Sequence, residues 1–389
     1  MKRNIVNVIV TVCIAATVLL SCEENEVASP VVTNIRVIEK DSTITGAEFN
    51  QTIAIQGSNL GSVRAVMFND VTVIPSPVYV TDNNIIIAVP DAAPKEVTNK
   101  ITLVTASGEQ VSIDFNVVLP PPEITALYNE FGIPGEENKV LGSYFFLITK
   151  VLVGSTEAEI VSFTDSEVTF VMPQDVTTST VTVVGAGGET TSTFRTHETD
   201  GRLINFDIPA TGWGSDVCWG DAERIDPDNS ELPVISGRYS RIKQTDLPAT
   251  GYNGSWVIST CYFDFGLPAA SHEDKYFKME VNVVESWKAG YYVIDIGIDG
   301  GDHFKYKFKP WDTDTYRTTG LKTEGWKTFY IPLSDFYKYN GDTQADPIVR
   351  ISDISKIRDV RVDFSNGAED ATVIASHYVA LDNLRIVDK

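Results

Sequence analysis

The sequence has few basic residues for its length. Its 389 residues include 31 Lys and Arg against 53 Asp and Glu, which gives a formal net charge of −22 at pH 7. Because phosphate binding depends on clustered basic side chains that release counterions, this balance argues against a nucleic-acid partner. It also disfavours uronic acid polymers as ligands, although salt screens exposed charges beyond about 10 Å.

Cysteine is also scarce, with four residues, and there are four histidines. The sequence has no CxxC pair, no zinc-site spacing, no nucleophile elbow, no His-containing triad and no phosphate-binding loop. We therefore predict a non-catalytic protein without a cofactor. Two alternatives stay open. One is a glycoside hydrolase, which needs only two carboxylates about 5 to 10 Å apart. The other is a structural Ca²⁺ held by backbone carbonyls and carboxylates such as Asp382 or Glu369.

Two of the cysteines lie in an N-terminal segment that resembles a bacterial lipoprotein signal. Lys2 and Arg3 precede a largely apolar stretch over residues 5–20, and residues 19–22 read Leu-Leu-Ser-Cys. This pattern predicts a signal peptide over residues 1–21 and lipidation of Cys22. A single membrane-spanning helix is the alternative, but the apolar stretch is shorter than the roughly 20 residues that a bilayer requires.

Acidic residues follow the predicted lipidation site at Glu23, Glu24 and Glu26. This run resembles the signal that sends lipoproteins of some Gram-negative bacteria to the outer face of the outer membrane. Lipid chains would then be the only attachment to the membrane, because acyl chains anchor a protein without a spanning helix. The alternative is that residues 22–30 are only a solvated acidic linker.

The remaining cysteines are Cys218 and Cys261. Cys261 alternates in phase with Val257, Ser259 and Phe263, a spacing that places it on a buried strand face. A disulfide between the two cysteines and a pair of inert buried thiols are both compatible with the pattern.

After the N-terminal segment, the sequence has no strong amphipathic helix. Short β-branched and aromatic runs alternate with Gly, Pro, Asn and Asp, which predicts an all-β protein. At about one domain per 150 residues, the length suggests two to four domains. Residues 31–119 predict a first small sandwich, and Pro120–Pro122 mark its end because proline cannot donate ladder hydrogen bonds. The strands that we expect in this sandwich cover residues 31–38, 51–56, 65–68, 85–89, 101–105 and 111–118.

A weak repeat indicates a second sandwich over residues 120–199. Thr81-Asp82 leading to Val89-Pro90 matches Thr164-Asp165 leading to Met172-Pro173, with the same interval. The first copy also contains IQGSNLG at residues 55–61 and VMFN at residues 66–69, and it resembles the immunoglobulin-like IPT/TIG fold. Neither copy gathers residues that suggest chemistry, so we interpret both as spacers. Whether they also bind ligand stays open.

Residues 200–389 predict a larger antiparallel jelly-roll sandwich. Alternation is clear over residues 276–284, where Phe277 and Met279 share one face and Lys278 and Glu280 the other. Further strands are expected at residues 291–298, 304–308, 328–333, 357–364 and 378–387.

Two phrases in this domain carry a family resemblance. They are GWKTFYIPLSDF at residues 325–336, preceded by KPW at 309–311, and ALDNLRI at residues 380–386. They resemble jelly-roll carbohydrate-binding modules. With the N-terminal signal and the IPT/TIG-like sandwiches, the chain resembles the surface glycan-binding proteins of polysaccharide utilisation loci, best the type whose C-terminal domain binds xyloglucan. The resemblance implies a polysaccharide ligand, and an outer-membrane glycan importer and surface glycan hydrolases as partners.

All six tryptophans lie within this domain, between Trp213 and Trp326. A pyranose presents an apolar face of C–H groups and a rim of hydroxyls, so it requires an exposed aromatic plane and a few polar groups beside it. Trp326 opens a strand with inward apolar residues and is interpreted as structural, and Trp256 is undecided. The aromatic residues that we predict to contact a glycan are Trp287, Trp311, Tyr306, Trp213 and Trp219.

Tyr306 shares a strand face with Phe304 and Phe308. The predictions for the tryptophans depend on loop positions, where burial is less automatic than in a strand. Trp287 lies in a polar turn between two strands, and Trp311 follows a proline in a loop with Asp312 and Arg317. Candidate partners for sugar hydroxyls are Asp312, Arg317, Lys307 and Asp216. The predicted function is capture of a neutral β-linked glycan at the cell surface. The alternative is an adhesin with a protein ligand.

Overall fold

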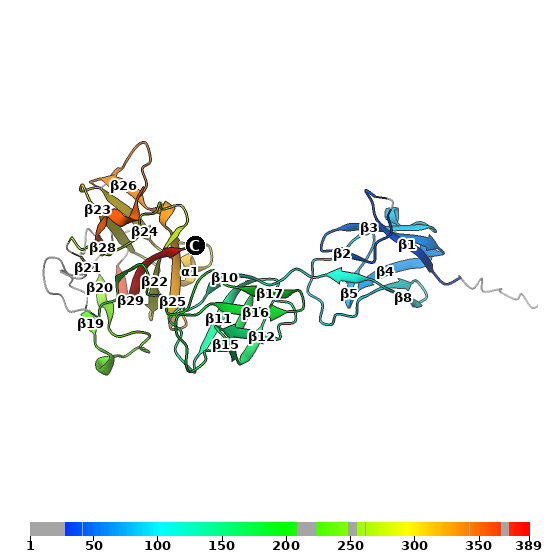
Figure 1. The fold of residues 1–389 in the computed structure, drawn as a ribbon, viewed down its shortest axis with the longest axis horizontal. Coiled ribbons are helices and arrows are strands. Elements are labelled where there is room, and N and C mark those ends of the chain that lie inside the picture. The colour runs from blue at the N-terminus through cyan, green and yellow to red at the C-terminus, as the bar shows by residue number, and fades with distance from the viewer. Residues whose placement is uncertain are drawn as a thin grey trace, which may run out of the picture. The chain divides into compact units, whose positions relative to one another are not determined.

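The computed structural model shows an all-β protein in two compact units (Figure 1). The first unit ends at Val117, and the second comprises Val118–Lys389 together with Ala92–Val97. The single α-helix among the described residues is one turn, α1 (Tyr316–Thr319), and no described helix has the length and apolar character needed to cross a bilayer. The structure describes residues 28–40, 42–207, 223–247, 255–260, 262–341, 343–366 and 373–389.

The first unit is a small sandwich built from alternating strands. One sheet has the order β1-β3-β6, a second has the order β5-β4-β7-β8, and β2 pairs with β9. The inward positions of these strands are fully buried, as at Ile53, Ile55 and Leu103. Its strands are β1 (Val31–Val37), β2 (Gly46–Glu48), β3 (Thr52–Ser58), β4 (Val63–Phe68), β5 (Val71–Val73), β6 (Asn84–Ala88), β7 (Lys100–Thr105), β8 (Gln110–Asp114) and β9 (Asn116–Val118).

The second unit begins with another sandwich of two four-stranded sheets. Their orders are β10-β11-β15-β14 and β13-β12-β16-β17. Val140, Val168, Phe170 and Val183 are among the buried residues of its core. Its strands are β10 (Glu123–Leu127), β11 (Glu137–Ser143), β12 (Lys150–Val153), β13 (Thr156–Ala158), β14 (Ile160–Phe163), β15 (Glu167–Val171), β16 (Val181–Gly185) and β17 (Gly188–Thr191).

The repeated Thr-Asp phrase makes the same turn in both sandwiches. The hydroxyl of Thr81 accepts from the amide of Asn84 at 3.0 Å, and the hydroxyl of Thr164 accepts from the amide of Glu167 at 3.1 Å. In each case the turn leads into a strand, β6 or β15. The weak repeat therefore reflects one structural unit used twice. The threonine recurs because its hydroxyl caps the turn.

The C-terminal part is a sandwich of two antiparallel sheets. The first, here called the β22 sheet, has the order β19-β20-β29-β22-β25, with β18 paired to β29, and the second, the β23 sheet, has the order β21-β28-β23-β24-β26-β27. The strands are β18 (Arg202–Ile204), β19 (Glu223–Ile225), β20 (Tyr239–Leu247), β21 (Ser255–Ser259), β22 (Lys275–Val283), β23 (Tyr291–Ile298), β24 (His303–Phe308), β25 (Trp326–Pro332), β26 (Tyr337–Asn340), β27 (Thr343–Gln344), β28 (Ile357–Ser365) and β29 (Ile374–Asp388).

The predicted fold class, two tandem sandwiches followed by a jelly-roll sandwich, is confirmed. The predicted boundaries at residues 119/120 and 199/200 fall in the connections β9 to β10 and β17 to β18. As limits of independently folding domains they stay predictions.

Candidate functional site

The structure corrects the prediction that Trp287 and Trp311 are exposed platforms. Trp287 is 2% exposed and Trp311 is 6% exposed. Each indole N–H donates to a backbone carbonyl, from Trp287 to Ala289 and from Trp311 to Gly290, both at 2.8 Å. The turn that carries Trp287 folds back over the core and forms a β-bridge with Leu321. Neither indole therefore presents a face to a ligand.

Tyr306 also faces the core. It shares its strand face with the buried Phe304 and Phe308, and its ring lies 5.5 Å from that of Phe336. Burial raises the pKa of its phenol. As predicted, Trp326 is structural: it is 3% exposed and donates to the carbonyl of Pro233.

The predicted polar partners Asp312 and Arg317 pair with each other on a surface loop. Arg317 donates to Oδ1 of Asp312 at 2.9 and 3.0 Å, and Lys309 lies 2.7 Å from Oδ2. These bonds, that from Lys309 first, lower the pKa of Asp312. With the indole of Trp311 below them turned inward, these charges lack the aromatic plane that a sugar requires.

Several predictions lie outside the described residues. They are the platforms Trp213 and Trp219, the partner Asp216, the cysteines Cys218 and Cys261, the lipidation site Cys22, and the acidic run after it.

The described structure instead brings polar residues together on the outer face of the β23 sheet. The alternate residues of its three central strands fill the core, as Ile294, Phe304 and Val362 show. The residues between them therefore point away from the core. In the ladder, Asp295 lies opposite both Lys305 and Arg361, while Val293 lies opposite Lys307 and Asp363, and Gly297 opposite His303 and Asp359. We call these nine residues the polar face.

Tyrosine rings border the polar face. Lys307 lies over the ring of Tyr291 at 5.1 Å, and Lys305 lies over the ring of Tyr339 at 5.6 Å. Both rings are half-buried, so part of each is open to solvent. A hollow of about 400 Å³ runs between Asp295, Arg361 and Tyr339, a size within the range of small-ligand sites.

The carboxylates of the polar face are held in place, and one lacks a full set of partners. Asp295 accepts from Nδ1–H of His303 at 2.9 Å, and Asp359 accepts from Thr260 at 2.9 Å. Oδ1 of Asp363 is buried without a hydrogen-bond partner among the described residues. Burial raises the pKa of Asp363 to about 6. A buried acceptor of this kind is costly unless a donor such as a hydroxyl reaches it.

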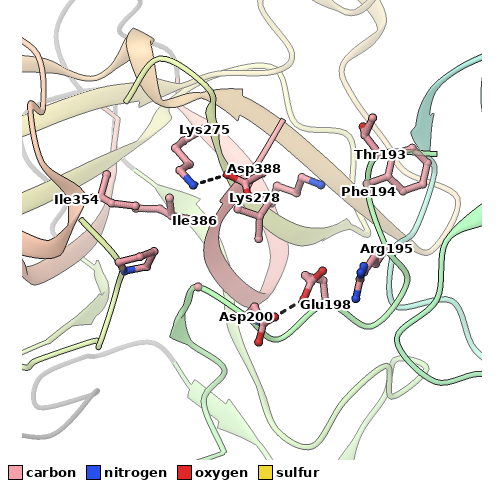
Figure 2. A pocket seen from close by; sticks show the side chains of 13 residues that line it. Thr193, Phe194, Arg195, Glu198, Asp200, Lys275, Lys278, Ile354, Ile386 and Asp388 are labelled. Carbon is pink, nitrogen blue, oxygen red and sulfur yellow. Dashed lines mark hydrogen bonds and ion pairs between the residues drawn. The ribbon is translucent and has the colours of Figure 1, made fainter. Parts of the chain in front are cut away.

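A second pocket, of about 410 Å³, lies between the second sandwich and the β22 sheet (Figure 2). Its walls carry paired charges, among them Lys275 with Asp388, and the buried Lys278 directed toward Phe194 (Figure 2). Phe194 is itself buried, at 8% exposure. This pocket offers no open aromatic plane, so it suits a pyranose less well than the polar face does.

Of the polar face, only Lys307 was predicted from the sequence as a contact for a sugar hydroxyl. The signal was present in the alternation of β23, β24 and β28, whose outward positions are polar or small. The outward positions of these strands therefore indicated the polar face better than the positions of the tryptophans did.

Asp382, a predicted ligand of a structural Ca²⁺, is fully buried. It accepts from Ser236 at 2.7 Å and from the amide of Asn383 at 2.8 Å. Burial raises its pKa well above the usual range. In the part of the chain that is described, no group of three or more acidic, His or Cys side chains is placed to hold a metal ion. Glu369 lies outside the described residues, so the Ca²⁺ site stays a prediction.

Comparison with known proteins identifies the family. Residues 196–388 match the model of the surface glycan-binding protein B xyloglucan-binding domain. The crystal structure of surface glycan-binding protein PbSGBP-B from Prevotella bryantii covers 93% of this chain and 99% of its own, at 25% identity and a TM-score of 0.71. This chain belongs to the surface glycan-binding proteins. The predicted resemblance is thus confirmed, and we call the C-terminal sandwich the glycan-binding domain.

Two further similarities were found, one in fold and one in sequence. A surface glycan-binding protein B from a complex xyloglucan utilization locus in Bacteroides uniformis shares the fold, at 18% identity and a TM-score of 0.51, covering 93% of this chain and 100% of its own. An IPT/TIG domain-containing protein from Bacteroides ovatus is 31% identical over 149 residues. That match covers 36% of this chain and 30% of the relative's length.

Proposed function

We propose that the polar face of the glycan-binding domain holds a neutral β-linked glycan of the xyloglucan or β-glucan class. The observation that carries the proposal is the combination of a hollow, two half-open tyrosine rings and a buried unpartnered acceptor on one sheet face. The tyrosines offer apolar planes for sugar C–H groups, and Asp295, Arg361 and Asp363 offer directional partners for hydroxyls. The family description adds the substrate class.

The charge of the polar face supports a neutral ligand. It carries the cations Lys305, Lys307 and Arg361 against the carboxylates Asp295, Asp359 and Asp363. Because these charges balance, an acidic or basic polymer gains little net attraction there. Two or three sugar contacts, each worth on the order of 1.5 to 3 kcal/mol, give an affinity of roughly millimolar to micromolar.

The proposal includes the setting in which the protein works. A non-catalytic protein that is lipid-anchored through Cys22 at the outer face of the outer membrane would retain the polysaccharide for surface hydrolases and an outer-membrane importer. Such modest affinity suits a ligand that must be passed on.

Affinity electrophoresis against xyloglucan, mixed-linkage glucan, mannan, xylan and starch tests the proposal. We expect retardation in xyloglucan or mixed-linkage glucan, and about tenfold weaker binding in Tyr291→Ala and in Tyr339→Ala, because each removes one apolar plane. Tyr79→Ala is the matched control, since Tyr79 is an exposed tyrosine of the first unit, at 54% exposure.

Three results would contradict the proposal. Retention by both variants at full strength would place the site elsewhere in the chain. Release of reducing sugar by the purified protein would support the hydrolase alternative. Absence of binding to every polysaccharide, together with binding to a protein surface, would support the adhesin.

A further inference from the structure

The second sandwich contacts the glycan-binding domain through buried charges. Glu130, from the loop after β10, is 0% exposed. Its Oε1 accepts from Lys278 of β22 at 2.6 Å, and its Oε2 accepts from Arg385 of β29 at 2.5 Å. Lys278 and Arg385 are 2% and 1% exposed. One carboxylate of the sandwich therefore pairs with two buried cations of the domain.

A second carboxylate completes the cluster from within the domain. Glu280 of β22 is 0% exposed and accepts from Arg385 at 2.8 and 3.0 Å. It also accepts from the hydroxyl of Thr328 at 2.9 Å. The buried cluster thus has two anions and two cations, and its charges balance only while Glu130 is present.

Backbone groups join the same two parts. The amide of Thr328 in β25 donates to the carbonyl of Tyr128 at 2.7 Å. The hydroxyl of Tyr330 accepts from the amide of Leu127 at 3.1 Å and lies 2.9 Å from Oε1 of Glu130. β25 is the last strand of its sheet, so the sandwich covers an edge that would otherwise expose unpaired groups.

We infer that the second sandwich and the glycan-binding domain form one cooperative folding unit, locked by the charge balance of Glu130, Lys278, Glu280 and Arg385. The structure groups both parts in a single compact unit. The second sandwich is then more than a spacer, because the functional unit runs from β10 to the C-terminus. Glu130 pairs with residues of the β22 sheet, whereas the polar face belongs to the β23 sheet, so Glu130 does not contact the proposed glycan site.

The electrostatics of the cluster agree with this inference. Burial lowers the pKa of Lys278, and the charge of Glu130 opposes that effect. Burial raises the pKa of Glu280, and the charge of Arg385 opposes it. Removing one member of a buried pair leaves an uncompensated charge, which is more damaging than removing both members.

Calorimetry of three variants in the otherwise complete chain tests the lock. Glu130→Gln leaves an excess positive charge in the cluster, and Lys278→Met leaves an excess negative charge. We expect each to lower the unfolding temperature of the shared transition by more than about 5 °C, or to split it in two. The double variant retains only the balanced Glu280 and Arg385, so it should recover most of the loss.

Glu159→Gln, an exposed carboxylate of the same sandwich, is the control and should leave the transition unchanged. If a single variant does not fold while the double variant does, the charge-balance lock is supported. The inference would be overturned by additive losses in the double variant, by failure of the double variant to fold along with a single variant, or by separate transitions in the unmodified chain. None of these readouts involves glycan, so they are independent of the proposed binding site.

Discussion

At the scale of the residue, Asp363 is the most informative side chain of the polar face. It is 9% exposed, and the groups that face it are Asp295, Asp359, Arg361 and Lys305. Burial, the largest influence, raises its pKa to about 6, with the neighbouring carboxylates adding to that effect. Above pH 6 its charge therefore works against folding in the free protein, and this penalty declines as the pH falls from 6 towards the ordinary pKa of 3.8, where the unfolded carboxyl also becomes protonated.

Glycan binding should depend on the charge of Asp363. Sugar hydroxyls that donate to Oδ1 favour the ionised carboxylate, so protons compete with the glycan below pH 6. We expect the affinity of the unmodified protein to fall between pH 7 and pH 5, by up to about tenfold per pH unit below the pKa. Isothermal titration calorimetry in a series of buffers measures this.

The matched variant is Asp363→Asn, which keeps an acceptor oxygen but does not titrate. It should bind more weakly at pH 7, with a flat pH profile. His303→Gln should keep the decline, because the decline is attributed to the carboxyl of Asp363, which this variant retains. A decline that persists in Asp363→Asn and disappears in His303→Gln would assign the effect to the histidine.

At the scale of the element, each of the two small sandwiches contains the same close approach between two neighbouring strands. A Cβ at Gly57 in β3 would lie 1.9 Å from the carbonyl oxygen of Val31, and a Cβ at Gly142 in β11 would lie 1.8 Å from that of Glu123. Only glycine permits this approach of the neighbouring strand. The equivalence extends the repeat beyond the Thr-Asp phrase, even though the surrounding residues differ.

Substitution of the first of these glycines should loosen its sheet. We expect Gly57→Ala to lower the free energy of unfolding of the first unit by about 1 to 3 kcal/mol, because β1 must move. Gly61→Ala, whose added Cβ meets its nearest neighbour at an ordinary 3.6 Å, should change it by less than about 0.5 kcal/mol. Amide hydrogen exchange in β1 and β3 measures the difference. Equal protection in both variants would show that the crossing is not tight.

At the scale of the whole molecule, the net charge of −22 bears on the kind of ligand. If the ligand is a neutral glycan, its affinity should change less than about twofold between 50 and 500 mM NaCl, since salt screens only charge–charge attraction. Surface plasmon resonance at the two salt concentrations measures this. A loss of tenfold or more would indicate a basic ligand, such as the protein partner of an adhesin.

Strand positions in this protein could be predicted closely because alternation has a direct physical cause. The expected strand at residues 291–298 coincides with β23, and that at 276–284 differs from β22 by one residue at each end. A side chain that faces the core must be apolar at every second position, and this constraint is local. The indoles of Trp287 and Trp311 were placed wrongly because a loop folds inward or outward according to contacts distant in sequence, such as the bridge from Trp287 to Leu321.

The sequence alone determined the fold class, the repeat and the family, since all three follow from periodicity and short phrases. It could not tell which polar strand face stays open. Lys278 and Glu280 of β22 alternate with apolar residues in the same way as Lys305 and Lys307 of β24. Lys278 and Glu280 are nevertheless buried, and Lys278 donates to Glu130 of the second sandwich, whereas Lys305 is half-buried and Lys307 is exposed. Only the docking of the second sandwich distinguishes the two faces, because alternation defines a polar side without defining what covers it.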